Sequence, residues 1–195
     1  MHTDLLERGH DYLRVIAGTA KKRRLKSPGN LPVRPTADRV KEALFNILNL
    51  RVPGCSFADL YAGTGGVGIE ALSRGAGKVL FAEKDPRVAR LLAENIKLTG
   101  LNNKAEIVHC DVDLALRRVA QRCEKYDIIF ADPPYRQGLA ATMLNTLARY
   151  PVWQVDVLIV LETDSNEELP EDTGVFVLWR REKYGDTALS FYQPV

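Results

Sequence analysis

Four consecutive residues, Asp132-Pro133-Pro134-Tyr135, combine the chemical groups needed to hold a planar amine. The aspartate carboxylate, together with carbonyl oxygens in a loop whose prolines lack N–H donors, can accept both hydrogens of an exocyclic amino group. The tyrosine ring offers a surface on which a flipped base can stack. We therefore predict that these residues contact a reacting amine. The alternative is a turn in which the prolines only end a strand.

A glycine-rich segment upstream provides a second group of candidate residues. Residues 59–68, DLYAGTGGVG, fit the G-x-G-x-x-G pattern, and Glu83 lies twenty residues beyond Gly63. Glycines let the backbone approach a ligand, and an acid at the end of the following strand can accept hydrogen bonds from ribose hydroxyls. The spacing predicts a nucleotide-containing ligand. The alternative is a tight turn that only packs a helix onto a sheet.

Asp59 favours a particular ligand for this segment. It lies four residues before the first glycine. A dinucleotide site needs no acid at this position. A ligand with a free amino acid moiety, in contrast, has an ammonium group that an acid can help to orient. The end of the chain, with two strand-like runs too close for a crossover helix, favours the same ligand. With these features the chain resembles the class I S-adenosylmethionine-dependent methyltransferases.

This resemblance implies S-adenosylmethionine as the cofactor. With only three histidines in the chain, we expect no histidine-rich metal site. It places Asp59 and the glycine loop against the methionine part and Glu83 against the ribose. It places Asp111 against the adenine amine, although the alternative for Asp111 is a helix cap. The predicted cofactor-binding residues are Arg34, Thr36, Asp59, Tyr61, Ala62, Gly63, Thr64, Gly65, Gly68, Glu83, Lys84 and Asp111.

The Asp-Pro-Pro-Tyr segment suits methyl transfer to an aromatic amine. Transfer from a sulfonium is an in-line displacement that depends mainly on orientation. An aromatic amine is a poor nucleophile, so acceptors that hold both N–H bonds would concentrate electron density on the nitrogen. Asp132 can also take the released proton, or the proton can pass to water. The segment is similar to the signature of methyltransferases acting on adenine, on guanine N2 or on glutamine, and does not choose among them.

Alternating apolar runs and helical periods must position these motifs. Such alternation predicts an α/β fold, Rossmann-like, with a mostly parallel seven-stranded sheet covered on both faces. The last two runs should form an antiparallel C-terminal hairpin. Strands are expected at 57–61, 78–82, 107–108, 126–131, 155–161, 175–179 and 189–192, and helices at 68–73, 86–98, 114–120 and 139–148.

The residues before the sheet are predicted to form a small β-hairpin and helix extension. The runs 12–18 and 23–26 indicate the hairpin. The helix follows Thr36, which can cap it, and ends at Pro53-Gly54. Its polar face is expected to carry Arg39, Lys41 and Asn46. We divide the chain into a basic N-terminal arm, residues 1–52, and a methyltransferase domain, residues 53–195.

The formal net charge of +2 conceals an uneven distribution. Residues 14–51 hold ten Lys or Arg against two acids, a local +8, so the remainder carries −6. We predict that the arm contacts RNA phosphates, and the alternative is a solvated loop. The predicted RNA-binding residues are Lys21, Lys22, Arg23, Arg24, Lys26 and Arg39.

Three residues near the start of the predicted helix have two interpretations. Arg34, Thr36 and Arg39 could close the site over the cofactor carboxylate or over the RNA backbone. The alternative is local, with Thr36 as a helix cap and Arg39 paired with Asp38 or Glu42.

Length and composition exclude several classes of protein. A chain of 195 residues with 46% hydrophobic and 27% charged residues is ordinary globular composition for one domain with an appendage. Three cysteines without C-x-x-C spacing indicate neither a disulfide framework nor a zinc site. No apolar run approaches the roughly 20 residues of a membrane span. We expect a cytoplasmic monomer.

Several segments together resemble one group more specifically. They are residues 14–18 (RVIAG), 34–48 (RPTADRVKEALFNIL), 59–65 (DLYAGTG), 70–76 (EALSRGA), 132–135 (DPPY) and 184–187 (YGDT). Across residues 14–193 the chain resembles the RsmD family of 16S ribosomal RNA guanine-N2 methyltransferases. The family usually has Lys-Gly-Arg where this chain has Lys22-Arg23-Arg24, and residues 1–10 match nothing in it.

The RsmD resemblance implies methylation of the exocyclic N2 amine of one guanine in 16S ribosomal RNA, within an assembled or assembling small ribosomal subunit. Two alternatives stay open from the sequence. One is an adenine-N6 methyltransferase acting on nucleic acid. The other is a non-catalytic RNA-binding factor for ribosome assembly that retains the fold.

Overall fold

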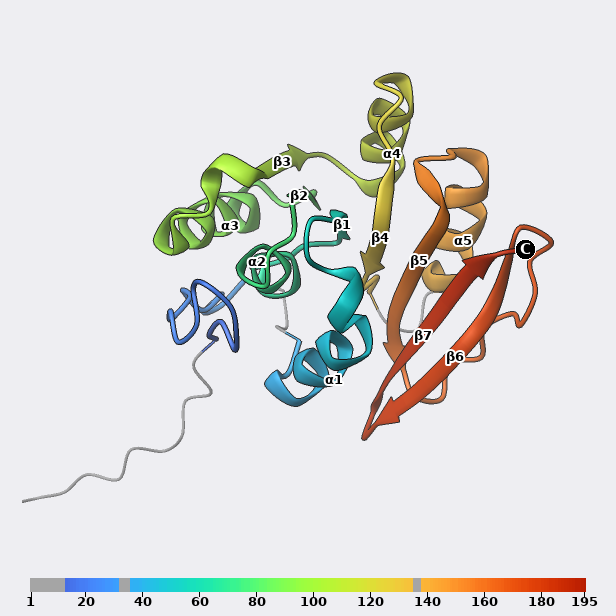
Figure 1. Cartoon of the computed structure of the whole chain (residues 1–195), viewed down its shortest axis with the longest axis horizontal. Coiled ribbons are helices and arrows are strands. Elements are labelled where there is room, and N and C mark those ends of the chain that lie inside the picture. Colours follow the sequence, from blue (N-terminus) through green and yellow to red (C-terminus); the bar gives the residue numbers. More distant parts are fainter. Residues whose placement is uncertain (1–12, 32–35, 135–137) are drawn as a thin grey trace, which may run out of the picture.

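A seven-stranded sheet in the order β3-β2-β1-β4-β5-β7-β6 forms the centre of the molecule (Figure 1). The structure is a computed structural model that describes residues 13–31, 36–134 and 138–195. The strands are β1 (Ser56–Leu60), β2 (Lys78–Glu83), β3 (Ala105–His109), β4 (Tyr126–Ala131), β5 (Trp153–Asp164), β6 (Phe176–Tyr184) and β7 (Thr187–Pro194). The helices are α1 (Asp38–Leu48), α2 (Gly66–Ser73), α3 (Pro86–Thr99), α4 (Val112–Gln121) and α5 (Leu139–Arg149), with short 3-10 turns at Asn49–Arg51 and Asn102–Lys104.

The predicted α/β class is confirmed, including the change of direction at the end of the chain. Strands β1 to β5 pair in parallel, whereas β7 pairs antiparallel with both β5 and β6. The hairpin is longer than the apolar runs indicated, because β6 continues through a charged segment to Tyr184 and turns at Gly185. Charged residues can occupy β6 because it is an edge strand.

Helices cover the sheet on both faces. Alternate strand residues such as Phe57 and Phe81 pack in one core with α1, α2 and α3, whereas Ala58 and Leu80 belong to a second core with α4 and α5. This alternation follows from the two-residue period of a strand. Two neighbouring residues at the end of a strand therefore face opposite sets of helices.

The N-terminal extension packs on the first of these cores. Leu13, Val15 and Leu25 are buried in the same cluster as residues of α1 and of the sheet. In place of a regular hairpin, the described residues 13–31 contain a single antiparallel bridge between Arg14 and Arg24. The segment is held mainly by side chains of α1, α2 and α3.

Two expectations for α1 are wrong. Thr36 does not cap the helix, because Ala37 occupies the N-cap and makes no side-chain capping bond. Lys41, expected on the exposed face, is fully buried. Its ammonium group donates to the carbonyl of Arg14 at 2.8 Å and lies 3.4 Å from Asp38, so the arm supplies its polar partners. Burial lowers the pKa of Lys41.

Candidate active site

A cavity with about 360 Å³ of empty space, part of it open to solvent, lies at the carboxyl ends of the parallel strands. This is the edge at which open α/β sheets bind their ligands. The lining residues are Thr36, Asp59, Tyr61, Ala62, Gly63, Thr64, Gly66, Val67, Phe130 and Asp132. The cavity therefore brings together the glycine loop and the first residue of the Asp-Pro-Pro-Tyr segment.

The glycine loop turns tightly from β1 into α2. Gly65 has φ of 85° and precedes the helix as its N-cap. A Cβ on Gly68 would lie 2.3 Å from the ring of Phe81 and 2.9 Å from Oδ2 of Asp59, so α2 approaches the sheet as closely as its backbone allows. At Gly63, in contrast, the carbonyl oxygen of Tyr61 at 4.0 Å is the only atom of the described residues that a Cβ would meet within 4 Å. The backbone at Gly63 thus leaves space in the cavity wall that a ligand can use.

Asp59 is a buried acid at the base of the cavity. Its Oδ2 accepts a hydrogen bond of 2.8 Å from the backbone N–H of Gly68. Burial raises the pKa of Asp59 to about 8; the Gly68 hydrogen bond opposes this rise, while the nearby carboxylates of Glu83 and Glu162 add to it. A cationic ligand group placed beside these acids would favour the ionised form of Asp59.

Glu83 ends β2 beside the glycine loop. One carboxylate oxygen accepts from the N–H of Gly63 at 3.0 Å and the other from the N–H of Asp85 at 2.8 Å. Each oxygen keeps a lone pair for a further donor, such as a hydroxyl group. Lys84 is exposed, and its carbonyl lies 3.1 Å from Nε2 of His109.

Asp111 caps α4. Its Oδ1 accepts from the N–H of Leu114 at 2.9 Å, which is the helix-cap alternative for this residue. The side chain is exposed, and contact between Asp111 and an adenine amine stays a prediction.

Asp132 follows β4 directly. Its backbone N–H points to the carbonyl of Leu60 at 3.4 Å, which continues the pairing of β4 with β1. The side chain is half-buried in the cavity wall, Pro133 is buried and Pro134 is exposed. Tyr135 and Arg34 lie outside the described residues.

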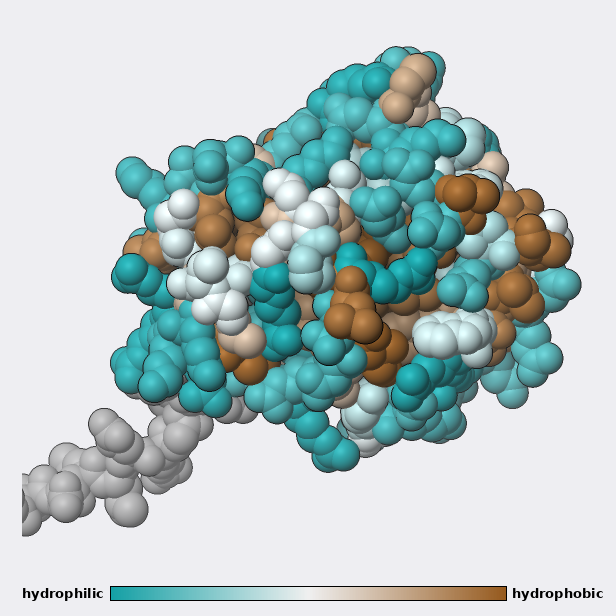
Figure 2. Space-filling model, in the orientation of Figure 1, coloured by the Kyte–Doolittle hydropathy of each residue, from teal (hydrophilic) through white to brown (hydrophobic). Residues whose placement is uncertain are grey.

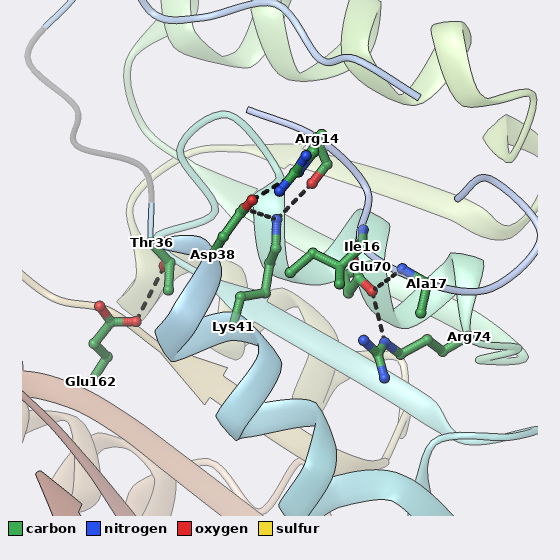
Figure 3. A network of polar contacts seen from close by, with 9 residues as sticks. All are labelled: Arg14, Ile16, Ala17, Thr36, Asp38, Lys41, Glu70, Arg74 and Glu162. Carbon is green, nitrogen blue, oxygen red and sulfur yellow. Dashed lines mark hydrogen bonds and ion pairs between the residues drawn. The ribbon is translucent and has the colours of Figure 1, made fainter. Parts of the chain in front are cut away.

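Glu162 was not among the predicted residues, yet it belongs to this edge of the sheet. It is buried near the end of β5, and its Oε2 accepts a hydrogen bond of 3.2 Å from the hydroxyl of Thr36 (Figure 3). An acid that directly follows the apolar run ending at Leu161 was the available signal, since Asp132 follows its strand in the same way. Thr36 therefore joins the segment before α1 to the sheet beside the cavity.

The basic arm presents its charges on a fixed backbone. Lys21, Lys22, Arg23 and Arg24 are exposed, and hydrophilic residues gather over the arm at the lower left of Figure 2. Lys26 is also exposed and pairs with Glu94 at 2.7 Å.

Buried groups of α2 hold the backbone of the arm in place. The carboxylate of Glu70 accepts from the N–H groups of Ile16 and Ala17 (Figure 3). The hydroxyl of Ser73 accepts from the N–H of Ala20 at 2.9 Å. Glu70 and Ser73 were missed because their sequence context is that of an ordinary helix.

Arg39 is exposed on α1. Asp38, one of its expected partners, forms ion pairs with Arg14 at 3.0 Å and with Lys41 at 3.4 Å. Within the arm, Asp38 therefore ties α1 to the preceding segment at Arg14.

Neither a metal centre nor a membrane span is found in the described part of the chain. Within residues 13–31, 36–134 and 138–195, no group of three or more His, Cys, Asp and Glu side chains is arranged to hold a metal ion. In the same ranges, no helix is both long enough and apolar enough to cross a bilayer.

The sequence of this chain matches known proteins over most of its length. The model of a family described as "Conserved hypothetical protein 95" matches residues 13–193. A protein of Bacillus subtilis (strain 168) with the provisional name rRNA methyltransferase YlbH is 38% identical, over 93% of this chain and 98% of that protein. Ribosomal RNA small subunit methyltransferase D of Escherichia coli (strain K12) is 33% identical, over 95% of this chain and 91% of that protein.

The fold also matches solved structures. A hypothetical protein of Thermus thermophilus superposes with a TM-score of 0.81 at 34% sequence identity, and the match covers 93% of this chain and 99% of that one. A match of nearly the whole of both chains means that the N-terminal extension and the terminal hairpin belong to the shared architecture.

Proposed function

The chain belongs to the RsmD family, whose sequence model is described as conserved hypothetical protein 95, and we propose that it methylates the exocyclic N2 amine of a guanine in 16S ribosomal RNA. S-adenosylmethionine is the methyl donor. The observation that carries the proposal is the cavity in which Asp59 and the glycine loop lie together with Asp132. A donor site and an amine-binding loop within one cavity are what a methyl transfer requires.

The residues of the cavity fit S-adenosylmethionine. When bound, this cofactor supplies an electrophilic methyl group on a positively charged sulfur. Asp59 lines the cavity, and an ammonium or sulfonium group bound beside it would favour its ionised form. Gly63 leaves room for close approach, and Glu83 has lone pairs available for ribose hydroxyls.

Asp132 is the residue that binds the amine of the substrate. Its carboxylate and the loop carbonyls accept the two N–H bonds of the guanine amine and direct the nitrogen lone pair toward the donor. Pro133, Pro134 and Tyr135 complete this loop, with the tyrosine ring as a stacking surface. The proton released after transfer passes to Asp132 or to water.

Residues 1–52 serve RNA binding and residues 53–195 serve methyl transfer. The exposed side chains of Lys21, Lys22, Arg23 and Arg24 support the first assignment, because a cluster of cations on a fixed backbone suits phosphate groups. The partner is 16S ribosomal RNA in an assembled or assembling small subunit. We expect a cytoplasmic monomer.

Identification of the methylated nucleoside tests the proposal. The protein is incubated with labelled S-adenosylmethionine and small ribosomal subunits from cells that lack the modification, and in parallel with free 16S RNA and with DNA. The RNA is then digested to nucleosides. N2-methylguanosine in the ribosomal RNA is expected. N6-methyladenosine as the sole product would identify an adenine methyltransferase, and tight RNA binding without any transfer would identify an assembly factor.

A further inference from the structure

Asn95 is a polar residue on the otherwise apolar buried side of α3. It is fully buried next to Ile96 and one turn from Leu92. Its Oδ1 accepts from the backbone N–H of Lys26 at 2.7 Å, and its Nδ2 donates to the carbonyl of Lys26 at 3.2 Å. The same Nδ2 donates to the carbonyl of Thr64 at 3.0 Å. One side chain therefore bonds to two segments that are distant in sequence.

The two segments belong to the two halves of the proposed function. Lys26 lies two residues after the basic run 21–24 in the arm, and Leu25 between them is buried. Thr64 belongs to the glycine loop, is buried and lines the cavity. A displacement of the arm backbone at Lys26 thus has a direct path of two hydrogen bonds to the cavity wall.

The chemistry of an amide suits this position. An asparagine can pair with both the N–H and the C=O of one residue, as a neighbouring strand would, and still has a second N–H to donate. An aspartate keeps the acceptor but lacks the donors. An alanine removes the partner of three backbone groups, of which the carbonyl of Thr64 is buried, and this is costly. Leu92 of α3 also packs closely against the glycine loop. A Cβ placed on Gly65 would lie 2.4 Å from the Cδ1 atom of Leu92.

We propose that Asn95 is a positioning residue that couples RNA binding at the arm to donor binding at the glycine loop. This inference rests on the proposed function, in which the arm binds RNA and the loop binds S-adenosylmethionine. RNA on the arm fixes Lys26, Asn95 transmits this to Thr64, and the cavity wall is held in the form that binds the donor. Because binding linkage is reciprocal, the donor strengthens RNA binding by the same factor.

Equilibrium dialysis with labelled S-adenosylhomocysteine measures the coupling. The dissociation constant is determined with and without saturating small ribosomal subunits. For the wild-type chain, bound subunits should lower the dissociation constant about fivefold or more, which is the lower end of typical allosteric coupling. The coupling ratio is the dissociation constant without subunits divided by the value with subunits. In Asn95→Ala the ratio should fall to about one. Asn95→Asp keeps the acceptor for the N–H of Lys26 and loses the donor to the carbonyls of Lys26 and Thr64. It should give the same loss, and it replaces the alanine variant if that chain does not fold.

Ser73→Ala is the matched control. Ser73 binds the arm at Ala17 and Ala20, and no bond from its side chain to the glycine loop is present among the described residues. This variant should keep the wild-type ratio. The inference is overturned if the wild-type chain binds both ligands without any tightening, if the Asn95 variants keep the tightening, or if Ser73→Ala loses it as well. A wild-type chain that binds neither ligand would instead refute the proposed function.

Discussion

The carboxylate of Glu70 accepts a hydrogen bond of 2.7 Å from the backbone N–H of Ile16, so a buried charge on α2 holds the main chain of the basic arm. The other carboxylate oxygen accepts from Ala17 at 2.9 Å and from Arg74 at 2.7 Å. One side chain more than 50 residues away therefore fixes two consecutive backbone N–H groups of the arm.

Replacement of Glu70 tests this dependence. Glu70→Ala leaves two backbone N–H groups and the Arg74 guanidinium without their acceptor, so we expect the free energy of unfolding to fall by about 3 kcal/mol or more. Urea denaturation measures the loss. Glu42→Ala, on the exposed side of α1, is the control and should change stability by less than about 0.5 kcal/mol. Equal stability of the two variants would contradict the anchoring role of Glu70.

Asp132 should be needed for turnover and dispensable for donor binding. Asp132→Ala removes the carboxylate that holds the amine, and we expect the single-turnover rate to fall about 100-fold or more. The affinity for S-adenosylhomocysteine should stay within about twofold of the wild-type value. Asp113→Ala, an exposed acid on α4, is the control and should retain full activity. An Asp132→Ala variant with an unchanged rate would exclude this mechanism.

Asp59 should make the stability of the ligand-free protein depend on pH. Its pKa is raised from 3.8 to about 8, so the folded chain binds more protons than the unfolded chain between these values. The free energy of unfolding therefore falls as the pH rises through this window. Asp59→Asn removes this dependence and keeps an oxygen that can accept from Gly68.

Urea denaturation of both chains at pH 5 and pH 8 measures the effect of Asp59. Between pH 5 and pH 8, the free energy of unfolding of the wild-type chain should fall relative to that of Asp59→Asn by an amount on the order of a few kcal/mol. A difference that is the same at both pH values would show that Asp59 ionises normally. The variant should also bind S-adenosylhomocysteine more weakly at pH 8, because the negative charge opposite its ammonium group is lost.

The arm should contribute a salt-dependent part of RNA affinity. Lys21→Gln with Lys22→Gln removes two exposed charges, so the slope of log K against log salt for RNA binding should become shallower by about 1.5. Lys104→Gln with Lys125→Gln is the matched control. Both lysines are exposed and directly precede β3 and β4, so they lie at the amino ends of the strands, whereas the cavity lies at the carboxyl ends. Equal slopes for the two double variants would remove the arm from the RNA interface. Donor affinity without RNA should be unchanged in both.

The sequence predicts the order and type of the elements well because the signals are local. Each parallel strand contains a short apolar run, and a glycine or proline follows closely after β1 and β4, at Gly63 and Pro133. The same signals place Asp59 and Asp132 at one edge of the sheet, and the cavity contains both. Tertiary contacts were not needed for this part of the site.

The contacts of the arm could not be predicted because their partners are distant. Lys41 is 27 residues from Arg14, Asn95 is 69 residues from Lys26, and Thr36 is 126 residues from Glu162. A charged or polar residue in a helix is normally expected at the surface, and only a partner from elsewhere in the chain makes burial favourable. Helical periodicity therefore placed Lys41 on the wrong side of α1.

The buried anchors of the arm also determine when it can fold during synthesis. Residues 14–26 leave the ribosome before any of their partners on α2 and α3, and Lys26 has no Asn95 to bind until 69 more residues have been added. A nascent chain halted after α1 would carry a cationic segment with an unfixed backbone, close to the RNA of the ribosome that is making it. The backbone of the cationic segment can therefore become fixed only after α3 has been synthesised.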